Sequence, residues 1–229
     1  MSKAPRKRVV VLISGRGSNM DALVRAAMDP SYPCLIVAVI ANRHDAGGLA
    51  KAESQGIPTA VVPHADYPDK QAHEIALLEA VGAYKPDIIC LAGYMRILSE
   101  QFVLKWKGRI LNIHPSLLPL FKGVDTHARA LTAGLRIHGC TVHFVTPQMD
   151  EGPIIAQAAV PVLTDDDENS LARRVLTAEH ELYPQALELV ATGRARLSAA
   201  GCIFSDIPTD SSGAILISPR QMAGKTANR

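Results

Sequence analysis

The sequence predicts an α/β protein with a mostly parallel central sheet that turns mixed near its C-terminal part and carries helices on both faces. Short β-branched runs alternate with helix-like stretches over residues 8–133, a pattern typical of parallel strands joined by crossover helices. Asp87–Ala92 is a continuous apolar run, as expected of a strand covered on both faces. His138–Val145 and Pro153–Val162 then follow as two consecutive strand-like runs, which favours antiparallel pairing there.

The elements of the first part follow from these runs and from local stop signals. Gly56 and Pro86 lie just beyond helix-like stretches, and Ser99 is a suitable N-cap. The expected strands are Arg8–Ser14, Leu35–Ala41, Thr59–Val62, Asp87–Ala92 and Arg109–Ile113. The expected helices are Asn19–Met28, Leu49–Gln55, Asp69–Tyr84, Glu100–Lys107 and one near His127–Ala133.

The C-terminal part is predicted to end in one long helix, Asn169–Ala191. Pro184 lies within it and predicts a kink or a break, because proline has no backbone N–H and crowds the preceding turn. From Ala199 onward Gly, Ser, Pro and Asp accumulate and periodicity fades. We therefore expect a single domain over residues 1–200 and a peripheral tail over residues 201–229.

Composition narrows the class of protein. Of the 229 residues, 48% are hydrophobic and 20% are charged, as in ordinary globular proteins. A formal net charge of +2 does not favour a nucleic-acid or membrane partner, and no apolar run approaches the ~20 residues that cross a bilayer. The four cysteines are widely spaced with no CxxC pair, which favours reduced thiols, no metal and a cytoplasmic location.

The loop Ser14–Asn19 joins the first strand to the first helix and contains two glycines. Glycine lets backbone N–H groups approach a ligand, and a helix N-terminus favours anions. A dinucleotide fingerprint needs a third glycine where Met20 stands and an acidic residue where Asn42 stands. The loop therefore favours a single phosphate group over a dinucleotide, while a tight turn that needs glycine only for its geometry is the alternative.

A second group of polar residues lies at the end of the fifth strand. Asn112 and His114 are two residues apart and point to the same side of a strand, and Pro115 biases His114 toward an extended backbone. Asp150, between the two late strands, is the carboxylate that we place against His114 as a hypothesis. An amide donor, an imidazole and a carboxylate can stabilise an oxyanion and move a proton. The alternative is that His114 only ends a strand and Asp150 is a turn residue before Gly152.

With these residues in view, the sequence resembles the phosphoribosylglycinamide formyltransferase family. The resemblance spans about residues 8–197, in order and at family spacing. Its core, Asn-x-His-Pro-Ser at residues 112–116, is also shared with related formyltransferases and with a formylfolate hydrolase. The matching blocks are residues 9–19 (VVVLISGRGSN), 91–99 (LAGYMRILS), 111–119 (LNIHPSLLP), 138–145 (HGCTVHFV), 149–154 (MDEGPI) and 178–184 (AEHELYP).

The resemblance implies a Rossmann-like formyltransferase fold and a specific reaction. The formyl group of 10-formyltetrahydrofolate, the co-substrate, passes to the amine of N1-(5-phosphoribosyl)glycinamide in de novo purine biosynthesis, by direct attack of the amine. The residues that match the family's functional positions are Asn112, His114 and Asp150 for catalysis, Gly17, Ser18 and Asn19 for the substrate phosphate, Glu179 for the glycinamide end, and Lys70, Met95, Arg96, Ile97 and Leu98 for folate. Small-molecule substrates are the implied partners, and a homodimer is allowed.

One position departs from the family, and rival functions stay open. Asp125 stands where some members carry a histidine, so substrate contacts there are uncertain. A formyltetrahydrofolate hydrolase would share the catalytic trio but carries an extra N-terminal domain, and a transfer-RNA formyltransferase carries a further C-terminal one. A nucleotide-dependent dehydrogenase would need the missing glycine and acid, and a phosphate-binding module without enzymatic activity would need neither Asn112 nor His114.

Overall fold

The computed structural model describes residues 5–206, which are built on a seven-stranded sheet of order β3-β2-β1-β4-β5-β6-β7. The first five strands in this order run parallel, and β6 and β7 join as antiparallel neighbours. The predicted mostly parallel sheet that turns mixed is confirmed. The strands are β1 Lys7–Ile13, β2 Cys34–Ala41, β3 Thr59–Val61, β4 Ile88–Leu91, β5 Ile110–His114, β6 Ile137–Phe144 and β7 Ile154–Pro161.

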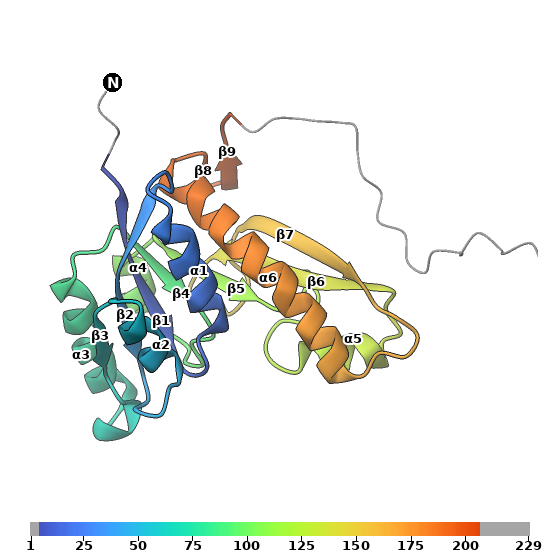
Figure 1. The fold of residues 1–229 in the computed structure, drawn as a ribbon, viewed down its shortest axis with the longest axis horizontal. Coiled ribbons are helices and arrows are strands. Elements are labelled where there is room, and N and C mark those ends of the chain that lie inside the picture. Colours follow the sequence, from blue (N-terminus) through green and yellow to red (C-terminus); the bar gives the residue numbers. More distant parts are fainter. Residues whose placement is uncertain (1–4, 207–229) are drawn as a thin grey trace, which may run out of the picture.

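Helices cover both faces of this sheet. The helices α1, α2, α5 and α6 supply side chains to one hydrophobic core, and α3 and α4 supply the other. Figure 1 shows the long α6 running along the sheet with α1 beside it. The helices are α1 Ser18–Met28, α2 Gly48–Ser54, α3 Lys70–Ala83, α4 Glu100–Lys105, α5 Thr126–Thr132 and α6 Glu168–Ala191, and a short 3₁₀ helix, η1, spans His64–Asp66.

The central strand β1 explains why two helical layers are needed. Val9, Val11 and Ile13 lie in the core under α1 and α6, whereas Val10 and Leu12 lie in the core under α3 and α4. All five side chains are fully buried, because successive residues of a strand point to opposite faces. A strand that is apolar on both faces is stable only when both faces are covered, so β1 needs helices on each side of the sheet.

Helix ends agree with the signals in the sequence. The Ser99 hydroxyl accepts a hydrogen bond from the Phe102 amide at 3.2 Å, which confirms it as the N-cap of α4. The predicted helix after it ends earlier than expected, at Lys105. Asp69 caps α3 by accepting from the Ala72 amide at 2.8 Å. These caps satisfy amides that the helices themselves leave unpaired.

The helix α6 is continuous through Pro184, so of the kink or break that the sequence predicted here the break does not occur. Tyr183 and Leu187 are fully buried on either side of the proline, and the Tyr32 hydroxyl donates to the Pro184 carbonyl at 2.7 Å. Tertiary packing therefore supports α6 where the helix lacks one of its own hydrogen bonds.

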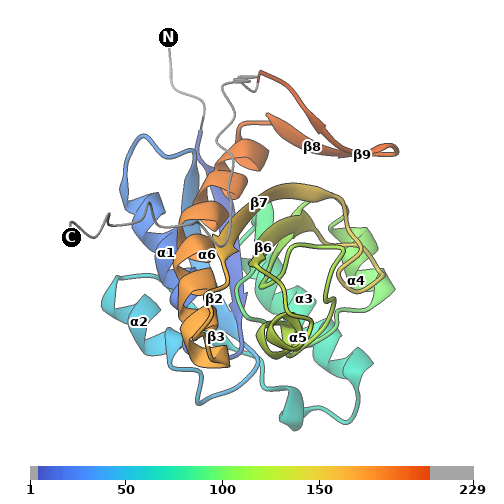
Figure 2. The ribbon, with the colours of Figure 1, turned by 90° about the vertical axis from the view of Figure 1, so that its right-hand side faces the viewer.

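After α6 the chain forms a small hairpin that the sequence analysis did not predict. Strands β8 Ala195–Ser198 and β9 Gly201–Phe204 pair antiparallel, and Figure 2 shows them standing off the main sheet. The expected boundary at residue 200 falls in the turn between these strands. Residues 207–229, most of the expected tail, lie outside the described residues.

The two ends of the strands carry different parts of the molecule. A crevice lies at their carboxyl ends, and the described residues begin and end near the opposite end. From β1 the chain builds outward to β3 and then returns to place β4 on the other side of β1, which opens a crevice at the carboxyl ends of β1 and β4. At the opposite edge, the Lys7 amide donates to the Pro33 carbonyl at 2.7 Å. There too, Gly108 lies against Leu197 of the hairpin.

Gly139 in β6 provides a test of how closely β6 and β7 pack. A Cβ atom at this position would lie 2.0 Å from the Ala158 carbonyl oxygen, so Gly139→Ala should lower the free energy of unfolding by about 3 kcal/mol, the upper part of the range for overpacking. Gly82→Ala is the matched control, because Gly82 lies exposed in α3 with no atom near its Cβ position, and it should stabilise by about 0.5–1 kcal/mol. Urea unfolding of both variants is the measurement, and equal stabilities would contradict this packing.

Candidate active site

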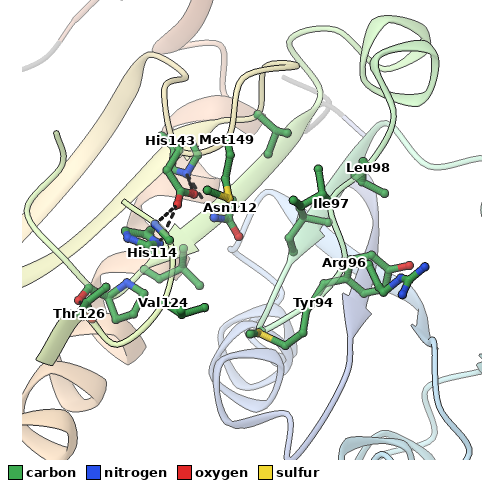
Figure 3. Close-up of a pocket in the computed structure, with 18 of the residues that line it drawn as sticks. Tyr94, Arg96, Ile97, Leu98, Asn112, His114, Val124, Thr126, His143 and Met149 are labelled. Carbon is green, nitrogen blue, oxygen red and sulfur yellow. Dashed lines mark hydrogen bonds and ion pairs between the residues drawn. The ribbon is translucent and has the colours of Figure 1, made fainter. Parts of the chain in front are cut away.

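A cavity of about 730 Å³ opens at the carboxyl ends of β4 and β5. It lies within the size range of small-molecule sites. Figure 3 shows Asn112, His114 and His143 gathered on one side of it and Tyr94, Ile97 and Leu98 on the other. Among the residues that the sequence predicted as functional, the lining includes Asn19, Met95, Arg96, Ile97, Leu98, Asn112, His114, Asp150 and Glu179.

The cavity draws on both faces of the sheet. Leu111 and Ile113 of β5 belong to the core under α1 and α6, so Asn112 between them points to the opposite face. Asn19 and Glu179 come from α1 and α6 themselves. The cavity therefore brings together side chains from both faces of the sheet at the carboxyl ends of its strands.

A carboxylate and two imidazoles meet at the inner wall. The Nδ1 atom of His114 lies 3.5 Å from Oδ2 of Asp150, with side-chain exposures of only 7% and 11%. The Nε2 atom of His114 lies 3.0 Å from the Phe121 carbonyl oxygen, which can only accept, so this nitrogen carries a proton. The Asp150 carboxylate faces the other nitrogen of the ring, so both ring nitrogens have a polar partner.

The second imidazole, His143, orients the Asn112 amide. Its Nδ1 donates to the Phe144 carbonyl at 2.9 Å, and its Nε2 lies 3.2 Å from the Asn112 amide nitrogen. Burial lowers the pKa of His143 and outweighs Asp150, whose Oδ1 lies 3.8 Å away. A neutral His143 accepts one N–H of Asn112, which leaves the other N–H for a ligand.

His143 was not singled out by the sequence analysis. It stands directly opposite Asn112 in the antiparallel pairing of β5 with β6. Only the register of that pair places the two side chains together, and a spacing of 31 residues along the chain does not reveal a register. The sequence could have indicated His143 only if the register of β5 and β6 had been known.

The backbone around Asp150 fixes its carboxylate. The Gly123 amide donates to Oδ2 of Asp150 at 2.8 Å, and Asp150 itself has a φ of 56°, in the left-handed region that few non-glycine residues adopt. A Cβ atom at Gly152 would lie 1.6 Å from the Phe144 carbonyl oxygen. Glycine is therefore required two residues after Asp150 for the loop to approach β6 so closely.

The loop after His114 is held by a buried hydroxyl. The Thr141 hydroxyl donates to the Ser116 carbonyl at 2.7 Å and accepts from the Leu118 amide and the Gln157 side-chain amide, each at 3.0 Å. Thr141 is also the partner of His114 in the pairing of β5 with β6. These bonds fix the direction in which the chain leaves β5 and hence the place of the His114 ring.

A second polar group lies on the α1 and α6 side of the cavity. The Asn19 amide nitrogen donates to Oε2 of Glu179 at 2.6 Å, and Glu179 is only 6% exposed. Burial raises the pKa of Glu179 to about 7, although the bond from Asn19 opposes this shift. The Oδ1 atom of Asn19 is buried and has no hydrogen-bond partner in the described structure. A ligand with N–H groups would satisfy both side chains.

The remaining predicted residues divide into those inside and outside the cavity. Gly17 begins α1 with a φ of 69° and packs against Gly48, and neither Gly17 nor Ser18 lines the cavity, although both directly precede Asn19. Lys70 begins α3, 3.9 Å from Glu74, and is likewise not part of the lining. Asp125, the residue that departs from the family, does line it.

The described residues, 5–206, contain no group of three or more His, Cys, Asp or Glu side chains placed to hold a metal ion. In the same range no helix has the length and apolarity needed to cross a membrane. All four cysteines are free thiols.

Comparison with known proteins places these features in a family. Residues 7–187 match the formyl transferase family. The chain belongs to the formyl transferase family. It is 43% identical to phosphoribosylglycinamide formyltransferase of Escherichia coli over 189 residues, which cover 82% of this chain and 89% of that enzyme.

Solved structures and longer relatives agree. The chain is 61% identical to phosphoribosylglycinamide formyltransferase from Brucella melitensis, whose crystal structure it matches with a TM-score of 0.79 over 82% of this chain and 97% of that one. It is also 51% identical to the trifunctional purine biosynthetic protein adenosine-3 of Bos taurus over 88% of this chain. The match spans 20% of that longer relative, so this chain corresponds to about a fifth of it.

The raised pKa of Glu179 predicts a pH-dependent cost to stability. Its carboxyl has a pKa of about 7 in the folded protein against an ordinary value of 4.5, so the folded state holds the proton more tightly and stability falls as pH rises from about 4.5 to about 7. Glu179→Gln removes this ionisation and should raise the free energy of unfolding by about 3 kcal/mol above pH 8, with no gain near pH 4.

Urea unfolding of Glu179→Gln across this pH range is the measurement. Glu181→Gln is the matched control, because Glu181 lies exposed on the same helix and its replacement should leave the pH profile unchanged. A Glu179→Gln profile parallel to that of the unaltered protein would show that the buried carboxyl is not the cause.

Proposed function

We propose that this chain transfers the formyl group of 10-formyltetrahydrofolate to the amine of N1-(5-phosphoribosyl)glycinamide in de novo purine biosynthesis. The observation that carries the proposal is the Asp150–His114 contact beside Asn112, in one cavity with Glu179. The identity to the Escherichia coli enzyme over 89% of its length supports the same reaction. We assign catalysis to Asn112, His114 and Asp150.

The amine substrate is assigned to the side of the cavity formed by α1 and α6. The helix α1 begins at Gly17 without a side-chain cap, so its first amides are available to a phosphate group, and the helix dipole favours that charge. We therefore assign the phosphate to Gly17, Ser18 and Asn19. Glu179 accepts N–H groups of the glycinamide end, and the buried Oδ1 of Asn19 is a further acceptor beside it.

The folate is assigned to the side formed by the loop after β4. Met95 and Ile97 are 70% and 62% exposed at the cavity, which is unusual for large apolar side chains and suits a flat aromatic ligand. Leu98 and Arg96 complete this wall. Lys70 lies outside the lining with its side chain 48% exposed, and we assign it to the charged outer part of the folate.

The proposed chemistry needs no group beyond the two substrates and these side chains. The amine nitrogen forms a bond to the formyl carbon, the bond from that carbon to N10 of the folate breaks, and one proton passes from the amine to N10. Negative charge develops on the formyl oxygen in between. The free N–H of Asn112 donates to this oxygen, and the His114 imidazolium, held by Asp150, stabilises it electrostatically.

We also assign the reaction to the cytoplasm, where the four free thiols agree with a reducing compartment. The partners are its small-molecule substrates. We include a homodimer in the proposal, and its only support is the family resemblance.

The direct test is an assay with the purified chain and 10-formyltetrahydrofolate, with and without N1-(5-phosphoribosyl)glycinamide. The expected result is formyl transfer only when the amine is present. It is measured by the absorbance of the folate product and by the amount of formylated amine. Equal folate turnover with and without the amine, ending in formate, would instead identify a hydrolase. No turnover with either mixture would also reject the proposal.

The role of His114 has its own test. His114→Ala removes the cation and the acid–base group, so kcat should fall by about 10²–10⁴-fold, the usual contribution of such a group. Binding of the phosphate substrate, measured by calorimetry, should change little, because His114 is not assigned to that subsite. His44→Ala is the control, since His44 is 75% exposed on another loop. Near-normal turnover of His114→Ala would remove His114 from catalysis.

A further inference from the structure

Tyr183 is a fully buried side chain that reaches from α6 to two strands at once. Its hydroxyl lies 3.1 Å from the Leu91 carbonyl oxygen in β4 and 3.1 Å from the Leu111 carbonyl oxygen in β5. Leu91 ends β4, just before the loop that forms the folate wall, and Leu111 directly precedes Asn112. One hydroxyl thus contacts the backbone at the base of two parts of the site.

The same helix carries Glu179, one turn before Tyr183. Residues four apart lie on the same face of a helix, so both side chains point from α6 toward the sheet. Pro184 follows at once and has no N–H to donate to the carbonyl of His180, the residue next to Glu179. The helix therefore lacks one of its own hydrogen bonds beside Glu179, and contacts with the sheet contribute to holding this turn in place.

The relative position of the two sides of the cavity depends on where α6 packs on the sheet, because the two sides lie on different faces of that sheet. Glu179 descends from α6, whereas Asn112 points to the face covered by α3 and α4. No hydrogen bond or ion pair links Glu179 directly to Asn112 among residues 5–206. The distance between Glu179 and Asn112 therefore depends on the position of α6 relative to β4 and β5. The Tyr183 hydroxyl joins α6 to both strands.

We propose that Tyr183 is a positioning residue whose hydroxyl holds Glu179 at a fixed distance from Asn112, so that the bound amine is aligned with the formyl carbon. This inference rests on the proposed function. Tyr183 touches neither substrate and acts through α6. Small errors of alignment are costly, because a displacement of about 1 Å can lower a rate by about 10²-fold.

Misalignment of the amine changes the products of the reaction, whereas a loss of stability alone does not. When the amine is held out of line, water can attack the formyl carbon in its place. The oxygen of water then bonds to that carbon and the bond to N10 breaks. One proton of water passes to N10 and the other is released, so the products are formate and tetrahydrofolate. The share of folate turnover that ends as formate therefore reports alignment.

The test compares Tyr183→Phe with Tyr32→Phe. Both remove a hydroxyl that donates to a backbone carbonyl and keep the ring, but the Tyr32 hydroxyl donates to the Pro184 carbonyl of α6 itself, and among residues 5–206 it makes no hydrogen bond to the backbone of β4 or β5. We expect Tyr183→Phe to lower kcat with saturating amine by about 10–100-fold, to raise the formate share, and to leave the KM for 10-formyltetrahydrofolate unchanged. Tyr32→Phe should leave all three near their original values. Each variant is assayed below its unfolding midpoint.

A double-mutant cycle with Glu179→Gln isolates the route of the effect. If Tyr183 acts by placing Glu179, Tyr183→Phe should lower kcat far less in the Glu179→Gln background than in the unaltered protein. Additive losses, an unchanged formate share, or equal effects of Tyr32→Phe would overturn the positioning role. Absence of formyl transfer by the unaltered chain would instead reject the proposed function, so the two failures are distinguishable.

Discussion

The carboxylate of Asp150 lies between two imidazole rings with little exposure to water, and the rest of the site is arranged around that buried charge. A carboxylate in such a place needs polar partners that replace water. The Gly123 amide donates to it, and Nδ1 of His114 lies 3.5 Å from it. His143 is close enough to interact, but its deeper burial keeps it neutral, so it can orient Asn112 instead of competing for the charge.

Meeting that constraint shapes a large part of the backbone. The loop after β5 must return to present Gly123, and the loop after β6 must fold back close enough for Gly152 to touch the Phe144 carbonyl. The antiparallel course of β6 makes both possible, because it places Thr141 and His143 directly beside β5. The mixed part of the sheet is therefore the part that builds the wall around Asp150, while the parallel part supplies the remaining walls of the cavity.

The sequence predicted most of the fold because its signals there were local. The apolar run of β4, the succession of strand-like and helix-like runs and the cap at Ser99 each depend on a few neighbouring residues. Signals that depend on distant contacts were lost. Pro184 predicted a kink or a break, whereas α6 is continuous with Tyr183 buried beside the proline, and the β8–β9 hairpin has too few apolar residues to form a recognisable pattern.

The candidate site divides in the same way. Asn112 and His114 could be paired from their spacing, because two residues along a strand share a side. The contact of Asp150 with His114 was a hypothesis that no spacing could supply, and the part of His143 needed the strand register. Burial of Glu179 beside Asn19, which raises its pKa, depends on how two helices pack and leaves no trace in a short motif.

The two ends of the described chain lie at the sheet edge remote from the cavity, where Lys7 binds the Pro33 carbonyl and the final hairpin rests near Gly108. Both ends of the described residues are thus clear of the cavity. In the bovine relative the matching region makes up only 20% of a much longer polypeptide, an arrangement that this geometry permits without rebuilding the site.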